Sequence, residues 1–247
     1  MDLRYLESCD STNLWAKAQY PTLGPLAAVY TMNQTLGRGR LGRRWENAAG
    51  QALYYTAVVQ QPLVQPETLP QLMSLVAAEA MQAQFGVTCQ IKWPNDLLLD
   101  GRKIAGILCE STEGPAGRVW ILGIGVNLAQ NAEHFAAQGL PYAGSLAMAG
   151  YPVQAETDAP ALAVRLTETL ARRLPDFAAQ GFVPLRAAYR SACVNLGRHV
   201  TWNTRDGVAG GRCTDVDDTG RLVVLSDAGT QEIFTGEVSV QGIYGSV

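Results

Sequence analysis

Residues 37–45 read Gly-Arg-Gly-Arg-Leu-Gly-Arg-Arg-Trp, and no other segment restricts the fold of this chain as strongly. Its three glycines free the backbone to turn, and its four arginines carry rigid forks of donors that suit phosphate and carboxylate oxygens. These residues predict a loop. Three interpretations of that loop remain open: it closes over an anionic ligand, it binds nucleic acid as an arginine–glycine patch, or it is a solvated basic loop.

Runs of residues with strand character flank this loop. Residues 27–32 before it and 53–59 after it are rich in β-branched and aromatic side chains. We therefore expect two strands that anchor the ends of the loop and leave its tip free. Farther along the chain, Asp100-Gly101 is a strong hairpin signal ahead of residues 103–108, and residues 119–128 form another apolar strand.

Helices are predicted at three places. The apolar side chains between Thr68 and Phe85 recur at helical spacing, and an amphipathic stripe at 162–177 predicts a helix that packs on the sheet. Residues 10–13, Asp-Ser-Thr-Asn, favour the start of a short helix because such side chains cap free backbone amides. Capping explains these residues structurally, but a helix N-terminus also presents hydroxyls and amides to a polar or anionic ligand.

The character of the chain changes near Asn195. Glycines at 207, 220 and 229 separate short strand-like runs at 200–203, 221–225, 231–234 and 237–240. Regular turns between short strands predict a small β-barrel of roughly 50 residues. The expected architecture is an α+β domain at 1–193, with a mixed sheet packed with helices, followed by a small all-β domain at 194–247.

Composition and charge exclude several functional classes. The chain has 247 residues of which 47% are hydrophobic, so it can bury a substantial core. Its formal net charge of −3 and pI near 5.4 argue against general binding to nucleic acid or to anionic membranes. No apolar run approaches the roughly 20 residues of a membrane-spanning helix, and the N-terminus does not begin a signal peptide.

Cysteine and histidine usage restricts the chemistry further. The five cysteines lie far apart, which excludes a paired zinc-binding spacing and indicates a reducing cytoplasm. With only His134 and His199, the sequence does not favour a histidine-rich metal centre or a Ser-His-Asp triad. Any catalysis must therefore use other groups.

Lysine is scarce, which draws attention to the segment Lys92-Trp93-Pro94-Asn95-Asp96. Only Lys17, Lys92 and Lys103 are lysines among the 19 basic residues. Lys92 follows Ile91 at a strand end, where it either snorkels over the sheet edge or places a point charge on a phosphate. Asp96 has three open roles: pairing with Lys92, holding Mg²⁺, or stabilising the turn.

Two glycines of one predicted strand, Gly123 and Gly125, lie on the same face because strand side chains alternate. They leave a flat place where a ring could lie against the backbone, or they mark a bulge or tight packing against a helix. Gly-Ile-Gly-Val-Asn-Leu is not a dinucleotide fingerprint, and the chain has no GxxxxGK[ST] phosphate loop. If the protein uses ATP, it does so by another route.

Together these motifs resemble those of the biotin protein ligases, in the order found in that family. The resemblance covers nearly the whole chain and includes the small SH3-like C-terminal domain, where Gly236-Glu237-Val238-Ser239 is similar to a family motif. It implies a catalytic domain related to class II synthetases. The motifs that carry it are Ser11-Thr12-Asn13, Gln34 with residues 37–45, Lys92-Trp93-Pro94-Asn95-Asp96, Lys103-Ile104-Ala105-Gly106-Ile107-Leu108, and Gly123-Ile124-Gly125-Val126-Asn127.

The resemblance implies a set of site residues. Ser11, Thr12 and Gln34 would contact the ureido ring of biotin, Tyr54 would lie beside that pocket, and Asn127 would lie near the adenine. Arg38, Arg40 and Lys92 are implied as catalytic residues, Lys92 by contacting the biotin carboxylate and the α-phosphate. The full set implied to bind biotin or biotinyl-AMP is Ser11, Thr12, Asn13, Gln34, Gly37, Arg38, Gly39, Arg40, Trp45, Tyr54, Lys92, Gly106, Gly123, Gly125 and Asn127.

The implied reaction has two steps. Biotin and ATP, with Mg²⁺, form biotinyl-AMP and pyrophosphate, and a lysine of a biotin carboxyl carrier protein then displaces AMP. Positive groups at the α-phosphate would stabilise the first transition state, and closure of the 37–45 loop would exclude water from the anhydride. An exposed sheet edge could pair two subunits, but the sequence does not fix the oligomeric state.

The chain departs from the family pattern in several places. It starts almost at the Ser-Thr-Asn motif, so we expect no N-terminal DNA-binding domain and no operator binding. Leu41 stands where some members have another arginine. Residues 143–146 replace a tryptophan that some members place over the adenine, and Gln241 replaces a frequent arginine, which leaves the barrel's contact with ATP open.

Other functions remain as alternatives. A lipoate ligase or octanoyltransferase shares the same chemical logic, but the full Gly-Arg-Gly-Arg loop and the C-terminal barrel argue against it. A nucleic-acid-binding protein would use the arginine–glycine loop and would depend steeply on salt. A non-catalytic adaptor built on the barrel would leave the motifs of the large domain without a role.

Overall fold

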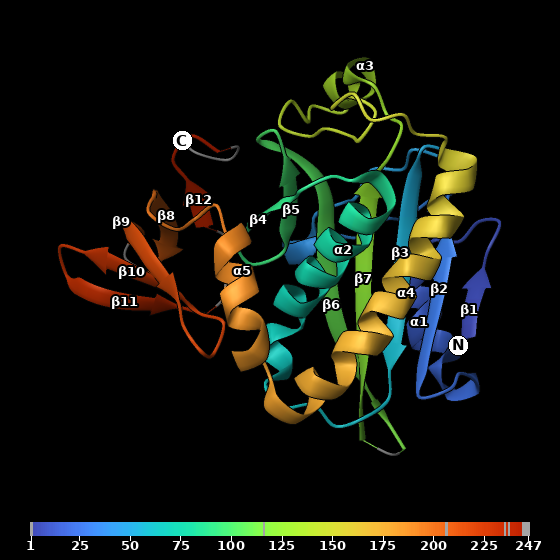
Figure 1. Cartoon of the computed structure of the whole chain (residues 1–247), viewed down its shortest axis with the longest axis horizontal. Coiled ribbons are helices and arrows are strands. Elements are labelled where there is room, and N and C mark those ends of the chain that lie inside the picture. Colours follow the sequence, from blue (N-terminus) through green and yellow to red (C-terminus); the bar gives the residue numbers. More distant parts are fainter. Residues whose placement is uncertain (1, 116, 206, 235, 237, 244–247) are drawn as a thin grey trace.

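The computed structural model describes residues 2–115, 117–205, 207–234, 236 and 238–243. Within these residues the main sheet has seven strands in the order β1-β2-β3-β7-β6-β5-β4 (Figure 1). β1 and β2 pair in parallel, and every other neighbouring pair is antiparallel. The strands are β1 (Asp2–Tyr5), β2 (Leu26–Thr31), β3 (Ala52–Val59), β4 (Gln90–Lys92), β5 (Asp96–Leu99), β6 (Arg102–Gly114) and β7 (Gly117–Asn127).

Two long helices cover one face of this sheet, namely α2 (Leu69–Phe85) and α4 (Ala155–Gln180) (Figure 1). Alternate residues of β3, such as Leu53 and Tyr55, point into the core with them. The short helix α1 (Thr12–Gln19) packs on the opposite face, with a smaller core of its own. That smaller core leaves part of the second face of the sheet without a covering helix.

The remaining helices are short. They are α3 (Ala132–Ala137), α5 (Arg186–Ala192) and the 3₁₀ turns η1 (Tyr20–Thr22), η2 (Arg40–Gly42), η3 (Pro66–Thr68) and η4 (Val183–Leu185). None of the helices in the described part of the chain combines the length and the apolar character needed to span a bilayer.

The strongest local signals of the sequence are confirmed. Asp100 and Gly101 both have positive φ, 50° and 73°, and join β5 to β6 as a tight hairpin turn. The helices predicted around 68–85 and 162–177 are present, the second one longer at both ends than its apolar stripe. β1 and α3 were not predicted from the sequence.

The C-terminal residues form a second, antiparallel sheet. Its strands are β8 (His199–Thr204), β9 (Gly207–Val216), β10 (Leu222–Ser226), β11 (Gly229–Ile233) and β12 (Val238–Val240), in the order β11-β10-β9-β8-β12. Within the described residues β11 and β12 do not pair, so this SH3-like sheet is open at both edges rather than a closed barrel. The strand predicted at 237–240 includes Glu237, which lies outside the described residues.

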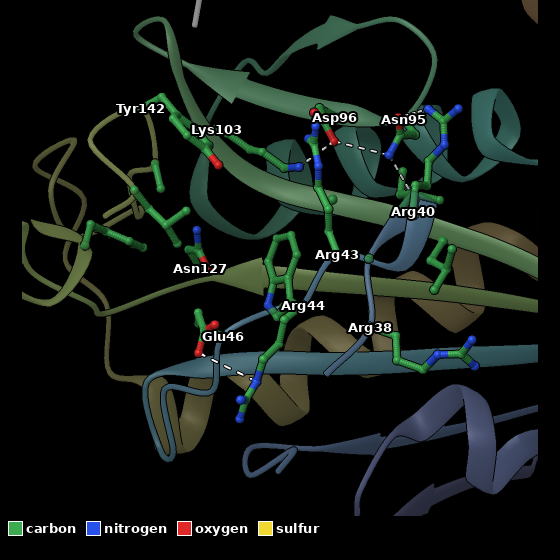
Figure 2. A pocket seen from close by; sticks show the side chains of 18 of the residues that line it. Arg38, Arg40, Arg43, Arg44, Glu46, Asn95, Asp96, Lys103, Asn127 and Tyr142 are labelled. Atoms are coloured by element: carbon green, nitrogen blue, oxygen red, sulfur yellow. Dashed lines mark hydrogen bonds and ion pairs between the residues drawn. The ribbon is translucent and has the colours of Figure 1, made fainter. Parts of the chain in front are cut away.

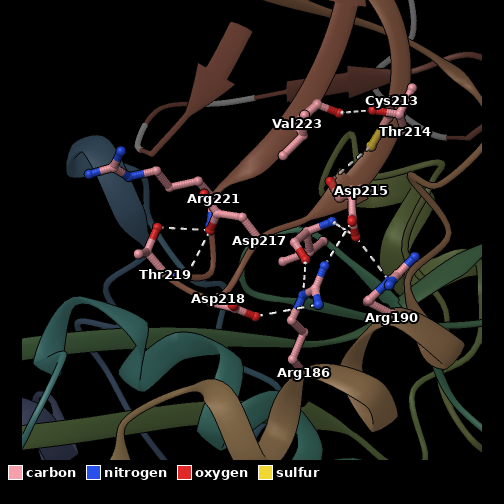
Figure 3. Close-up of polar contacts among 11 residues, drawn as sticks. Arg186, Arg190, Cys213, Thr214, Asp215, Asp217, Asp218, Thr219, Arg221 and Val223 are labelled. Atoms are coloured by element: carbon pink, nitrogen blue, oxygen red, sulfur yellow. Dashed lines mark hydrogen bonds and ion pairs between the residues drawn. The ribbon is translucent and has the colours of Figure 1, made fainter. Parts of the chain in front are cut away.

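Charged side chains attach the C-terminal sheet to α5 (Figure 3). The guanidinium of Arg186 donates to the Val216 carbonyl at 2.7 Å and to the Asp215 carboxylate at 2.8 Å, and it pairs with Asp218 at 3.3 Å. Arg190, one turn later on α5, pairs with the second oxygen of Asp215 at 2.9 Å. The carboxylates all belong to the end of β9 and the turn that follows it.

Buried contacts continue this attachment behind the ion pairs. The Gly220 carbonyl accepts hydrogen bonds from Trp93 Nε1 at 2.9 Å and from Gln71 Nε2 at 3.1 Å, and both donors belong to the main domain. Cys193 and Cys213 lie buried at the same boundary as free thiols. Burial raises the pKa of the Cys193 thiol to about 11 and that of Cys213 to about 12, so both stay protonated near neutral pH.

We predict that Arg186→Met lowers the free energy of unfolding by about 2 kcal/mol, because it removes hydrogen bonds from a charged donor that is less than one-third exposed. Arg118→Met is the matched control. The Arg118–Glu113 pair is as short, at 2.7 Å, but both side chains are more than half exposed, so its loss should cost about 0.5 kcal/mol or less. Urea unfolding measures both, and equal losses would contradict the structural role of Arg186.

Candidate functional site

A row of facing residues crosses the open part of the main sheet. Tyr54 of β3 faces Gly125 of β7, Gly125 faces Gly106 of β6, and Gly106 faces Asp96 of β5. Directly opposed residues of neighbouring strands point to the same side. The row therefore has side chains at both ends and a bare backbone strip in the middle.

The ring of Trp45 lies on this bare strip. A Cβ atom added at Gly106 would stand 2.5 Å from the ring, and one at Gly125 would stand 2.6 Å from it. At Gly123 an added Cβ would collide with the carboxamide of Asn13. Each of two interpretations left open by the sequence therefore holds at one glycine: a ring lies against the backbone at Gly125, and a helix residue packs tightly at Gly123.

Trp45 also separates two pockets. The larger one, here the basic pocket, encloses about 940 Å³ including its open mouth and extends from the 37–45 loop to Tyr142. The smaller one, here the polar pocket, encloses about 310 Å³ and is lined by the start of α1, Gln34 and Tyr54. Both volumes are in or near the range of small-molecule sites. The residues that line both pockets are Arg38, Trp45, Gly106 and Leu108.

The basic pocket carries an excess of positive charge (Figure 2). Among the residues that the structure describes, its basic lining side chains are Arg38, Arg40, Arg43, Arg44 and Lys103, and its acidic ones are Glu46 and Asp96. This concentration of cations, in a chain of net charge −3, suits a ligand with several negative charges.

Lys103 is the central cation of this pocket. Its Nζ lies 2.8 Å from Asp96 Oδ1 and 5.4 Å from the centroid of the Trp45 ring. Both the carboxylate and the face of the ring stabilise an ammonium ion. Lys103 thus holds its charge beside the wall that the two pockets share.

Arg40 fixes the loop to other parts of the molecule. Its guanidinium donates to Asn95 Oδ1 at 2.7 Å and to the carbonyl of Gly236, next to β12, at 3.0 Å. Within the loop, the Gly39 amide donates to the Arg43 carbonyl at 2.7 Å. Leu41, at the tip, has a φ of 55° and is 71% exposed. The loop is therefore anchored at its sides and strained at its tip.

The polar pocket contains hydroxyls and amides at the start of α1. Ser11 occupies the N-cap position, yet its hydroxyl makes no capping hydrogen bond. Gln34 Oε1 instead accepts the backbone amide of Thr12 at 2.9 Å. The Ser11 hydroxyl therefore lines the pocket without a capping hydrogen bond, and the ligand-binding interpretation of the sequence stays a prediction.

Tyr54 forms the far wall of the polar pocket. Its hydroxyl accepts a hydrogen bond from the backbone amide of Ala48 at 2.8 Å and lies 3.2 Å from Asn47 Oδ1. Burial raises the pKa of Tyr54 to about 12, so the phenol stays neutral and serves as a wall and a hydrogen-bonding group rather than as a base.

Glu110 of β6 lies behind the polar pocket. Its carboxylate accepts hydrogen bonds from Asn13 Nδ2 at 2.9 Å and from Lys17 Nζ at 2.8 Å, and it forms an ion pair with Arg38 at 3.5 Å. Partial burial favours the neutral acid, but the hydrogen bonds from Lys17 and Asn13 and the charges of Lys17 and Arg38 outweigh it and lower the pKa of Glu110. Glu110 is therefore a carboxylate at neutral pH.

Hydrogen-bonded carboxamide side chains line the end of the basic pocket farthest from the polar pocket. Asn127 Nδ2 donates to the Gly144 carbonyl at 2.9 Å, and Gln130 Nε2 donates to Asn127 Oδ1 at 3.0 Å. The neighbouring wall consists of Phe135 and Tyr142. Asn127 thus lies at a distance from the polar pocket, on the side that the resemblance gives to the adenine.

Most of the predicted site residues come together in these pockets. The polar pocket includes Ser11, Thr12, Asn13, Gln34, Arg38, Trp45, Tyr54, Gly106, Gly123 and Gly125, and the basic pocket adds Gly39, Arg40 and Asn127. Gly37 and Lys92 line neither pocket. Gly37 supports the site indirectly, because any side chain there would collide with the Trp45 carbonyl and approach Gln34 Nε2.

The structure distinguishes the positions of Lys92 and Lys103. Lys92 is buried on β4 opposite Asp96 in the strand register, and Lys103 lines the basic pocket and pairs with Asp96. Sequence reasoning also passed over Asn95 and Glu110 as site residues. The scarcity of lysine drew attention to every lysine and the apolar neighbourhood singled out Lys92, whereas the position of Lys103 in the pocket follows from the pairing of β5 with β6.

Comparisons with known proteins agree with this arrangement. Residues 5–127 match the model of the Biotin/lipoate A/B protein ligase family, and residues 196–241 match the Biotin protein ligase C terminal domain. The biotin--[acetyl-CoA-carboxylase] ligase of Paracoccus denitrificans is 36% identical, over 96% of this chain and 100% of that protein.

Longer relatives and solved structures also match. The bifunctional ligase/repressor BirA of Bacillus spizizenii is 28% identical over 86% of this chain, and the chain spans only 65% of that relative's length. The biotin protein ligase from Aquifex aeolicus, solved in complex with biotin and ATP, superposes with a TM-score of 0.79 at 25% identity, covering 97% of this chain and 98% of that one.

We predict that Gly125→Ala displaces Trp45 and lowers the melting temperature by roughly 3–10 °C, the range expected for an overpacked contact in a chain of this size. Gly24→Ala is the control, because an added Cβ there meets nothing within 4 Å. Scanning calorimetry measures the melting temperature of both variants. An unchanged melting temperature for Gly125→Ala would show that the packing of the Trp45 ring does not require a residue without a Cβ atom at position 125.

Proposed function

The chain belongs to the biotin protein ligases of the biotin/lipoate A/B protein ligase family, and from this we propose that it activates biotin with ATP as biotinyl-5′-AMP and transfers it to a lysine of a biotin carboxyl carrier protein. The observation that carries the proposal is the shared wall of the two pockets. A small neutral pocket suited to a ureido ring meets a basic pocket suited to a nucleotide, and Arg38 lines both.

The first step joins the two substrates at that wall. A carboxylate oxygen of biotin attacks the α-phosphorus of ATP, the bond from that phosphorus to the bridging oxygen breaks, and pyrophosphate leaves with the electron pair. Negative charge gathers on the α-phosphate oxygens during this step. Arg38 and Lys103 flank the position and would stabilise that charge, which is the largest catalytic contribution such a site can make.

The second step needs no nucleophile from the enzyme. The neutral ε-amine of the carrier lysine attacks the carbonyl carbon of the mixed anhydride, AMP leaves with the electron pair of the broken C–O bond, and the amine loses its extra proton to solvent. The open mouth of the basic pocket admits the lysine. The 37–45 loop, held through Arg40 to Asn95 and Gly236, would restrict water from the anhydride.

Mg²⁺ would enter as the partner of the triphosphate. Within the described residues no group of three or more His, Cys, Asp or Glu side chains gathers to hold a metal ion, and the carboxylate of Asp96 already pairs with Lys103. Mg²⁺ commonly keeps several waters and binds through substrate phosphates. Mg²⁺ would therefore be held mainly by the phosphates of ATP, to which it would supply positive charge.

Two further parts of the proposal concern partners and organisation. We propose that the chain acts as a ligase without repressor activity, since its net charge of −3 does not supply the basic surface that operator binding uses. We also propose that residues 1–193 form the catalytic domain and residues 194–247 the SH3-like domain. The C-terminal sheet would then influence catalysis through the Arg40–Gly236 contact.

The function is tested by pyrophosphate release from MgATP with biotin, lipoate or octanoate supplied singly and no carrier protein present. A burst of about one pyrophosphate per enzyme with biotin alone is expected, because a retained adenylate stops the reaction after one turnover. A burst with lipoate or octanoate would assign the chain to the other branch of the family. If none of the three acids causes pyrophosphate release, the ligase proposal is overturned.

The role of the two lysines is tested by Lys103→Met and Lys92→Met in the same assay. We expect Lys103→Met to slow the burst by about 100-fold or more, the usual effect of removing one charge-stabilising donor, and Lys92→Met to slow it far less. Circular dichroism controls for folding of both variants. If Lys92→Met has the larger effect while folded, the catalytic lysine is the one that the sequence suggested.

A further inference from the structure

A chain of hydrogen bonds leads from Glu110, behind the polar pocket, to Thr12, which lines that pocket. It passes from Glu110 through Asn13 and Thr56 to Thr12. Thr56 is fully buried in the middle of β3 and does not line either pocket. A hydroxyl group can either donate or accept a hydrogen bond, so the proton orientations in such a chain are not fixed by the hydroxyls themselves. They become fixed when a group at the end of the chain can only accept, or can only donate, a hydrogen bond.

Glu110 supplies that restriction. As a carboxylate it can only accept, so the atom of Asn13 that faces it at 2.9 Å must be the nitrogen. The second hydrogen of the same nitrogen donates to the Leu108 carbonyl at 3.2 Å. Both partners are acceptors, so the carboxamide of Asn13 cannot turn over, and its Oδ1 must face Thr56.

The direction then passes through two hydroxyls. Thr56 Oγ1 lies 2.7 Å from Asn13 Oδ1 and 2.8 Å from Thr12 Oγ1, and it has one proton to donate. Asn13 Oδ1 can only accept, so the Thr56 proton goes to Asn13. The proton between the two hydroxyls must therefore come from Thr12, which turns its O–H inward.

Gln34 is a second, more distant acceptor for the Thr12 proton. Its Oε1 lies 3.2 Å from Thr12 Oγ1, farther than Thr56 does, and already accepts the Thr12 amide at 2.9 Å. The same bond fixes Gln34 Nε2 as the outward atom, and within the described part of the chain no protein acceptor takes its hydrogens. The pocket thus presents lone pairs at Thr12 and donors at Gln34.

We propose that Glu110 and Thr56 are positioning residues that fix the Thr12 hydroxyl as a hydrogen-bond acceptor, so that the polar pocket selects a ligand with an N–H at that position. The inference rests on the proposed function, because a ureido ring offers an N–H beside a carbonyl. Its N–H would donate to Thr12, and its carbonyl oxygen would accept from Gln34. Neither positioning residue touches the ligand.

The test compares binding of biotin with two analogues in which one or the other ureido N–H is replaced by a ring oxygen. Wild type should reject one analogue strongly, because the ring oxygen faces the lone pairs of Thr12. In Thr56→Val the Thr12 proton is released and can turn to the ring oxygen. The ratio of the analogue Kd to the biotin Kd should then fall by about tenfold or more, the effect of one hydrogen bond.

Thr56→Ser is the matched control, because it keeps the hydroxyl and should keep the wild-type ratio. Asn13→Leu removes the acceptor for the Thr56 proton, so it should lower the ratio of the analogue Kd to the biotin Kd as Thr56→Val does. It serves as the test if the valine variant does not fold. Calorimetric titration gives each Kd without turnover. An unchanged ratio in folded Thr56→Val or Asn13→Leu, or equal binding of both analogues and biotin by wild type, would overturn the inference. Failure of wild type to bind biotin would instead overturn the proposed function.

Discussion

The contact between the Trp45 ring and the bare backbone at Gly106 and Gly125 is the constraint on which the rest of the site depends. A ring can approach two neighbouring strands this closely only where both lack a Cβ atom, and the register of β6 with β7 places the two glycines opposite each other. Because Trp45 ends the basic loop, the contact also fixes that loop over the sheet. The same ring divides the two pockets, so one interaction gives the site its loop, its wall and its two compartments.

Two arginines of the site form contacts that a phosphate could replace. Arg38 pairs with Glu110 at 3.5 Å, and Arg40 donates to the neutral oxygens of Asn95 and Gly236. An incoming phosphate offers Arg40 a full charge in place of neutral oxygens, and it offers Arg38 the chance of a closer partner than the carboxylate at 3.5 Å, so both arginines can exchange partners. Each exchange still gives up an existing bond, which lowers the affinity below the sum of the new contacts. The ion pair at Lys103 is shorter, at 2.8 Å, and keeps that cation in place before any ligand arrives.

Local signals in the sequence predicted local structure well, and non-local pairing explains what they missed. The hairpin at Asp100-Gly101 and the basic loop need only turn chemistry and glycine content, which a sequence displays directly. The assignment of a pocket lysine needs the register of β5 with β6, which shifts between Leu97 and Leu98, and no sequence pattern gives that shift. β9 was missed because its glycine-rich start hides its strand character. Glu110 stood outside the sequence motifs, and only the packing of α1 on the main sheet brings Lys17 and Asn13 to it.

A charged group can affect a distant ligand through the direction of the hydrogen bonds that connect them. Here the charged group is the partly buried carboxylate of Glu110, and the chain of hydrogen bonds leads to Thr12. A chain of hydroxyls and amides is ambivalent, since each member can donate or accept, and a ligand could then reverse the whole chain at little cost. An ionised carboxylate at one end removes that freedom, because it has no proton to give. Partial burial raises the pKa of Glu110, and the hydrogen bonds and charges around it, with Lys17 foremost, outweigh that effect and lower the pKa, which favours the carboxylate. In the proposed scheme the Lys17–Glu110 ion pair would therefore contribute to selectivity, through the orientation of one hydroxyl proton at the pocket.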